Sequence, residues 1–224
     1  MIPSVDIAMV LAPGDRMELK EFLERWDQLP ELKFAELIDG VVYMPSAVSL
    51  PHGDFDRLAG SVFGYYRLRS GICSGSTNAT WLMRESAPQP DLALYLQPEY
   101  GGQTKIGPRK LGSGIPELTV EVCISSRSYD LGPKLALYER VGVPEYLAIV
   151  IEEKRFEWRT LVQDSYQFLQ PENGVFRSRI LPGLWIDEPA FWRADGPRLL
   201  TVLEDGMNSP EFLEFKRKLK PASE

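Results

Sequence analysis

The apolar residues in the first third of the chain follow the spacing of two helices and one hairpin. Residues 17–29 carry leucine, phenylalanine and tryptophan at intervals of three and four, which predicts a helix on the N-terminal side of a proline. Residues 34–44 form two short apolar runs around an Asp-Gly pair, a strong signal for a two-residue β-hairpin. Helical spacing returns over residues 51–68, so a second helix is expected there.

The rest of the chain alternates short strand patterns with one further helix before a charged C-terminal helix. Strands are expected at 80–84, 91–96, 118–124, 145–151, 155–161 and 166–169. A helix is expected at 129–140, with Gly142 as its C-cap. The Gly/Pro-rich stretch 97–116 is too long for a plain connector, which predicts a functional or mobile loop. Residues 210–220 read as a short charged helix.

The pattern predicts one mixed α/β domain, because no repeat, low-complexity tract or linker divides it. We expect an N-terminal extension at 1–16, the domain at 17–200 and a helical tail at 201–224. A content of 44% hydrophobic and 25% charged residues is that of an ordinary globular protein and argues against collagen-like, coiled-coil and disordered classes. The sequence has neither a long apolar run for a membrane span nor a signal-peptide pattern, so we expect a cytoplasmic protein without a membrane partner.

Charge and cysteine content argue against several classes of protein and of metal site. A net charge of −7 argues against a protein that coats nucleic acid by bulk electrostatics, but it leaves room for an enzyme with a local basic groove. Two cysteines and one histidine cannot assemble a Cys/His zinc site. Phosphate-loop, dinucleotide-binding and GxSxG patterns are also missing from the sequence.

Two carboxylates occupy positions where a carboxylate is costly. Glu121 lies inside the most apolar predicted strand, where a buried charge needs a partner, a metal ion or a raised pKa. Asp91 opens another strand 30 residues earlier, and Lys134 lies 13 residues after Glu121, in the following helix. Such a trio suits phosphodiester hydrolysis, with Mg²⁺ held by oxygen ligands and lysine as a nearby cation. On spacing alone, a solvent-facing strand glutamate and a Pro-Asp turn remain the commoner explanation.

A series of short motifs appears in an order typical of one bacterial family. The motifs are Glu36-Leu37-Ile38-Asp39-Gly40, His52, Pro90-Asp91, Glu121-Val122, Tyr129-Asp130 through Lys134 to Tyr138, and Gly142-Val143-Pro144-Glu145-Tyr146. Over roughly residues 17–192 the chain resembles the Uma-two type of restriction endonucleases, a branch of the PD-(D/E)XK nuclease superfamily. The resemblance implies a restriction-endonuclease-like α/β core, with a mixed (α+β) sheet and flanking helices, often in a homodimer.

The resemblance also implies a catalytic site. Asp91 and Glu121 would bind Mg²⁺ (or Mn²⁺), with Glu36 as an accessory acidic residue and His52 as a further candidate. The lysine that the superfamily carries on the strand would have moved to the helix as Lys134. Cys123 stands at the strand-lysine position, so catalysis would depend wholly on Lys134.

These observations predict a Mg²⁺-dependent endonuclease that hydrolyses DNA with water as nucleophile. An RNA or branched-DNA nuclease shares this chemistry, and a catalytically inactive nuclease-fold protein acting as a binding or regulatory module is the alternative class. The direction of the Lys134 side chain would separate the active from the inactive interpretation. Asp130 is expected to be a helix N-cap and Tyr138 a packing residue. Basic candidates for contacts with the nucleic-acid backbone are Lys105, Arg109, Lys110 and Arg127.

Overall fold

The computed structural model describes residues 10–45, 47–124 and 126–219. Its N-terminal part consists of α1 (Leu19–Asp27) and the hairpin of β1 (Glu36–Ile38) and β2 (Val41–Tyr43). Asp39 and Gly40 both have positive φ angles, 50° and 76°, as the type I′ hairpin turn requires. The predicted helix and hairpin are both confirmed here.

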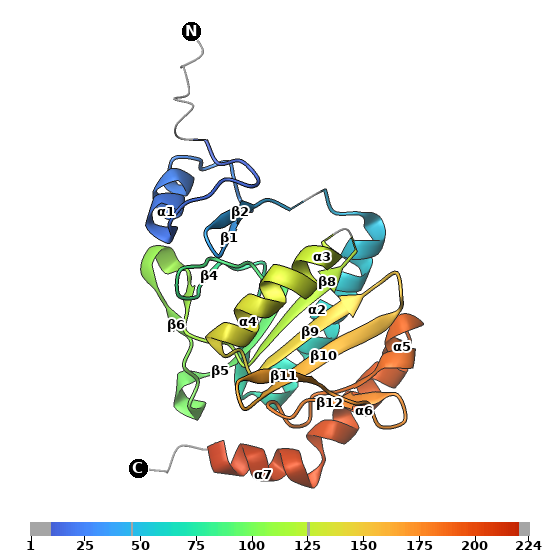
Figure 1. Cartoon of the computed structure of the whole chain (residues 1–224). Helices are drawn as coiled ribbons and strands as arrows, with labels where there is room; N and C mark the ends of the chain where they lie inside the picture. The colour runs from blue at the N-terminus through green and yellow to red at the C-terminus, as the bar shows by residue number, and fades with distance from the viewer. Residues whose placement is uncertain (1–9, 46, 125, 220–224) are drawn as a thin grey trace.

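The centre of the molecule is a six-stranded mixed sheet in the order β11-β10-β9-β8-β5-β3 (Figure 1). Its strands are β3 (Cys73–Thr77), β5 (Leu92–Leu96), β8 (Leu118–Cys123), β9 (Glu145–Val150), β10 (Arg155–Val162) and β11 (Ser165–Phe168). β8 and β9 are parallel and every other neighbouring pair is antiparallel. All residues of β8 and β9 are buried, which explains their continuous apolar sequences. The predicted mixed α/β class is confirmed.

Helices cover both faces of this sheet, and β8 contributes alternate residues to each side. The long helix α2 (Leu50–Ser70) packs with Val120 and Val122 in the larger core, while Cys123 belongs to a second core that includes Tyr138. Because side chains alternate along a strand, Glu121 lies on the same face as Cys123. The fold therefore directs Glu121 toward the helical segment α3 (Arg127–Tyr129), η4 (Asp130–Lys134) and α4 (Leu135–Val141).

The stretch expected to be a loop at 97–116 holds more regular structure than predicted. It contains the 3₁₀ turns η2 (Pro98–Tyr100) and η3 (Pro108–Lys110), and the short strands β6 (Lys105–Ile106) and β7 (Gly112–Ser113). These strands form a small sheet with β4 (Trp81–Leu82), which is shorter than the strand expected at 80–84. A Cβ atom on Gly112 would lie 2.7 Å from the Trp81 ring, so β7 depends on a contact far away in the sequence.

The C-terminal region adds elements that the periodicity did not reveal: β12 (Val175–Arg177), β13 (Trp185–Asp187), α5 (Glu188–Trp192) and α6 (Gly196–Met207), followed by the expected helix α7 (Pro210–Leu219). Leu199 and Leu203 on α6 are buried in the larger core. The boundary expected at residue 200 thus falls inside a packed helix, although the division into domains stays a prediction. Within the residues that the structure describes, no helix is long and apolar enough to cross a membrane.

Candidate active site

The helix that carries Lys134 contains a widened turn. The amide of Leu135 donates to the carbonyl of Asp130, five residues earlier, which makes η4 a π-helical turn. Pro133 has no N–H to donate, so it cannot make the regular α-helical hydrogen bond there. The Asp130 N-cap prediction is wrong: helical structure begins at Arg127, and Asp130 is buried within it in a helical conformation.

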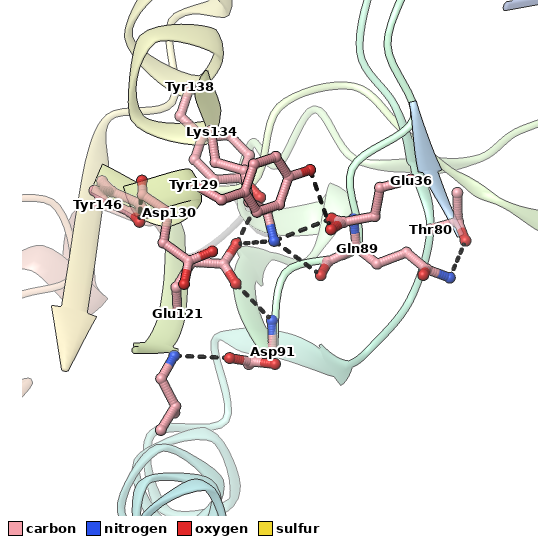
Figure 2. Close-up of polar contacts among 11 residues, drawn as sticks. Glu36, Thr80, Gln89, Asp91, Glu121, Tyr129, Asp130, Lys134, Tyr138 and Tyr146 are labelled. Atoms are coloured by element: carbon pink, nitrogen blue, oxygen red, sulfur yellow. Dashed lines mark hydrogen bonds and ion pairs between the residues drawn. The ribbon is translucent and has the colours of Figure 1, made fainter. Parts of the chain in front are cut away.

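Lys134 lies at the centre of a buried polar cluster (Figure 2). Its Nζ is 2.7 Å from Glu121 Oε1 and 3.0 Å from Glu36 Oε1, and it donates to the carbonyl of Gln89 at 3.3 Å. The side chain is only 3% exposed. Burial by itself lowers the pKa of this amine, but Glu121 and Glu36 outweigh burial and hold the pKa well above its ordinary value. Lys134 is therefore a fixed cation.

Glu121 has one oxygen occupied and one oxygen nearly free. Oε1 accepts from the Tyr138 hydroxyl at 2.9 Å as well as from Lys134, whereas Oε2 accepts, among the described residues, only the Asp91 amide at 3.4 Å. Burial raises the pKa of Glu121 well above its ordinary value, and the charge of Lys134 opposes this effect. The ionised carboxylate therefore depends on positive charge nearby.

Asp91 lies beside Glu121 because it immediately precedes β5, which pairs with β8. Its Oδ2 accepts the backbone amide of Val122 at 2.7 Å, and Oδ1 has no hydrogen-bond partner among the described residues. Burial raises the pKa of Asp91, while Lys134 and the Val122 amide lower it. Asp91 Oδ1 and Glu121 Oε2 are consequently the two weakly bonded carboxylate oxygens of the site.

Glu36, at the start of β1, has both oxygens occupied. Oε1 accepts the Gln89 amide at 2.6 Å in addition to the lysine, and Oε2 accepts the Tyr129 hydroxyl at 3.2 Å. The Tyr129 ring stacks on Tyr43 with centroids 4.1 Å apart, and the Lys134 Nζ lies 5.5 Å from the Tyr129 centroid. This bonding pattern suits a residue that positions the lysine.

The donor set fits a hard divalent cation only in part. Across residues 10–45, 47–124 and 126–219, no group of three or more His, Cys, Asp or Glu side chains is arranged to hold a metal ion. Mg²⁺, however, is usually bound by one or two carboxylates, with water and substrate phosphate completing its octahedron. The free oxygens of Asp91 and Glu121 match that smaller requirement, so the residues fit Mg²⁺ or Mn²⁺.

Comparison with known proteins identifies a family and a similar fold. The model of a family named Uma2 and described as "Putative restriction endonuclease" matches residues 19–189. The chain belongs to the Uma2 family. The crystal structure of a "putative nuclease belonging to DUF820" from Anabaena variabilis has a TM-score of 0.60 and 14% identity, covering 79% of this chain and 98% of that chain. At this identity the likeness concerns the fold, and it confirms the predicted nuclease-like architecture. No significant match is found among curated proteins.

In this Uma2 chain, His52 lies near the carboxylates without bonding to them. It occupies the first turn of α2, where its charge lowers the pKa of Asp91. Asp56, one turn later, was missed by sequence reasoning; burial raises its pKa, and the negative charge of Asp91 raises it further. Residues four positions apart lie on the same face of a helix, so the spacing of His52 and Asp56 was the available signal.

The structure brings Asp91, Glu121, Lys134 and Glu36 into one cluster. The basic residues expected to contact nucleic acid make their contacts elsewhere. Arg109 pairs with Asp27 at 2.7 Å, both being exposed, and Arg127 pairs with Glu153. Exposed Lys105 and Lys110 are likewise separate from the buried contacts.

Three residues of the cluster were not predicted to take part in it. The sequence predicts a packing role for Tyr138, yet its hydroxyl donates to Glu121; its position one turn after Lys134 is the available signal. Tyr129 and the backbone of Gln89 gave no such signal. Cys123 is buried as expected, and burial raises the pKa of its thiol, which keeps it neutral.

Proposed function

We propose that this Uma2-family protein is a metal-dependent endonuclease with a PD-(D/E)XK-like site that hydrolyses DNA phosphodiester bonds. One observation carries the proposal: a buried lysine lies against one oxygen of Glu121, while among the described residues the other oxygen accepts one long hydrogen bond and Asp91 Oδ1 accepts none. Asp91 is only partly buried and Glu121 Oε2 keeps one long hydrogen bond, so both oxygens are available to a metal ion. The family and the nuclease-like fold support the same reaction class.

Each residue has a separate task in this proposal. Asp91 and Glu121 would hold Mg²⁺ (or Mn²⁺), which when bound activates water and stabilises charge on the phosphate. Lys134 supplies a cation beside the scissile group, and its raised pKa keeps it protonated at neutral pH. Glu36 orients Lys134, and Tyr138 holds Oε1 of Glu121 so that Oε2 remains available.

The alternative of a catalytically inactive binding module is less well supported. It would be favoured by a Lys134 that faces solvent, whereas the Nζ atom contacts two carboxylates. DNA as substrate, assembly as a homodimer and a cytoplasmic location belong to the proposal and await measurement.

A cleavage assay tests the proposal with variants of the two carboxylates and a matched control. Wild type, Asp91→Asn and Glu121→Gln are incubated with Mg²⁺ or Mn²⁺ and supercoiled, linear or single-stranded DNA. Glu117→Gln is the matched control, because this partly buried carboxylate precedes β8 and accepts the Leu96 amide instead. We expect wild type and control to cleave, and the two site variants to lose about 10²-fold or more in rate.

Calorimetry on the same proteins separates the possible failures. Metal binding that disappears in Asp91→Asn and Glu121→Gln, together with cleavage, supports the proposal. Metal binding at the site with every DNA form left intact would contradict nuclease function and favour the binding module. Cleavage of RNA alone would overturn the assignment of DNA.

A further inference from the structure

A pocket of about 460 Å³ lies beside the carboxylate cluster, within the usual range of roughly 300–1,000 Å³ for ligand sites. Its apolar lining residues include Trp26 of α1, Leu29 and Leu111, and its polar lining residues include Asn78 and Gln89. No contact of the proposed hydrolytic reaction uses this pocket.

The pocket and the cluster share one residue, Gln89. The backbone of Gln89 bonds Glu36 and Lys134, while its side-chain amide lines the pocket and donates to Thr80 Oγ1 at 2.8 Å (Figure 2). The backbone amide of Asn78 donates to the carbonyls of Pro90 and Asp91, both at 3.1 Å. A molecule in the pocket would therefore meet Gln89, whose backbone bonds the cluster, and Asn78, whose backbone bonds the carbonyl of the proposed metal ligand Asp91.

The lining combines a flat aromatic surface with unused amide groups. The indole of Trp26 is held in place, because its Nε1 donates to the Leu32 carbonyl at 2.6 Å. Gln89 Oε1 and the side-chain amide of Asn78 make no hydrogen bond to any residue that the structure describes, so acceptors and a donor remain available. A nucleobase presents the matching groups, an apolar face and a polar edge.

The rim of the pocket adds positive charge. Lys33 and Arg109 line the pocket, and Arg109 is neutralised by Asp27. Lys33 is exposed and makes no ion pair within the described part of the chain, so its amine can meet a phosphate next to the base.

We propose that this pocket binds one nucleobase of the substrate strand, next to the phosphodiester that the carboxylate cluster receives. This inference rests on the proposed function and specifies its substrate class. A base inside a duplex must first be unpaired and unstacked to enter a pocket, which costs a few kcal/mol, so a single strand or a strand with an unpaired base is the favoured substrate.

Binding to two oligonucleotides of equal length and charge tests the proposal. Both are single-stranded and fluorescently labelled; one has bases throughout and the other is abasic at its central positions. Anisotropy is measured in EDTA at one fixed salt concentration, so that cleavage does not interfere and phosphate contacts are equal. We expect wild type to bind the base-containing strand roughly tenfold more tightly.

Two variants change different residues of the pocket lining. Leu111→Trp fills it without adding charge, and Asn78→Gly removes the polar side chain at a φ of +50°, a conformation that glycine adopts without strain. Asn173→Gly is the matched control, an exposed asparagine with φ +51° in the turn before β12, outside the pocket. Both pocket variants should lose the preference for bases and retain the affinity for the abasic strand, whereas the control should keep both.

Equal affinity of wild type for the two strands, or an unchanged preference in both pocket variants, would overturn the base pocket. Cleavage of the same strands with Mg²⁺ distinguishes this from failure of the nuclease proposal. A nuclease without a base pocket would cleave both strands at equal rates, while a base pocket without nuclease function would give the binding preference and no cleavage.

Discussion

Replacing Lys134 with methionine removes the central charge of the cluster and keeps most of the side-chain length. Glu121, with a side chain that is 2% exposed, would keep only the Tyr138 hydroxyl and a long bond to the Asp91 amide. Glu36 would keep the Gln89 amide and the Tyr129 hydroxyl. The main penalty therefore falls on Glu121, which becomes a buried carboxylate without a cation.

Breaking a buried ion pair by removing one partner costs about 3–5 kcal/mol. Protonation of Glu121 relieves this cost, because its pKa is already raised by burial and rises further without Lys134. A carboxyl group whose pKa is higher in the folded than in the unfolded protein loses its contribution to stability as the pH rises through the folded value. The destabilisation should therefore be largest at pH 8, and at pH 5 it should approach the roughly 1–2 kcal/mol of the lost hydrogen bonds.

Urea denaturation in EDTA at pH 5 and pH 8 measures this effect. With a slope near 3 kcal/mol/M for a chain of this size, the midpoint should fall by about 1–2 M at pH 8. Glu121→Gln added to Lys134→Met should recover a large part of the loss. Lys216→Met, which removes a single bond to the Ser70 carbonyl, is the control and should cost about 1 kcal/mol or less. An equal loss at both pH values, with no recovery in the double variant, would refute the electrostatic reasoning.

Two further predictions concern stability away from the cluster. Gly64→Ala on α2 should stabilise the protein by about 0.5–1 kcal/mol, since a Cβ there meets nothing within 4 Å. Gly206→Ala on α6 should destabilise it by about 1–3 kcal/mol, since its Cβ would lie 2.5 Å from the Gly183 carbonyl oxygen. The urea midpoints of the two variants measure these changes. A lower midpoint for Gly64→Ala, or a higher one for Gly206→Ala, would contradict the packing argument. Burial raises the pKa of Glu145 from 4.5 to about 7. The free energy of unfolding should therefore fall by on the order of 3 kcal/mol as the pH rises through this interval. Glu145→Gln should flatten this decline in melts at pH 5 and pH 8, and an undiminished slope in the variant would exclude Glu145 as its source.

The central strands could be predicted from the sequence because they are buried on both faces and read as nearly continuous apolar runs. β8 and β9 are examples, and all their residues are buried. β3 could not be predicted, since its sequence, Cys-Ser-Gly-Ser-Thr, has no apolar alternation and the strand is defined by its pairing with β5. β7 likewise depends on Gly112 packing against the distant Trp81. Long-range contacts of this kind leave no local pattern.

The candidate site likewise contains residues that the sequence could predict and residues that it could not. Asp91 and Glu121 were found because a carboxylate in or beside an apolar strand demands an explanation. The role of Glu36 was available only from the family resemblance, since its hydrogen bond to Gln89 joins residues 53 positions apart. Asp130 was assigned to a helix end because nothing in the local pattern located the helix start at Arg127.

The π-helical turn carries Lys134, a lysine on a helix that contacts a carboxylate on a strand. A strand lysine at position 123 would be held by the register of the sheet, two residues from Glu121, whereas a helix lysine depends on how the helix is seated. Here the widened turn at Pro133 is tied to the sheet, because the Tyr146 hydroxyl on β9 donates to the Asp130 carbonyl at 3.0 Å. β9 pairs with β8 in register, with Ala148 opposite Glu121. Through β9 the sheet therefore positions Lys134 relative to Glu121, so the proposed site does not need a cation at the position that Cys123 occupies.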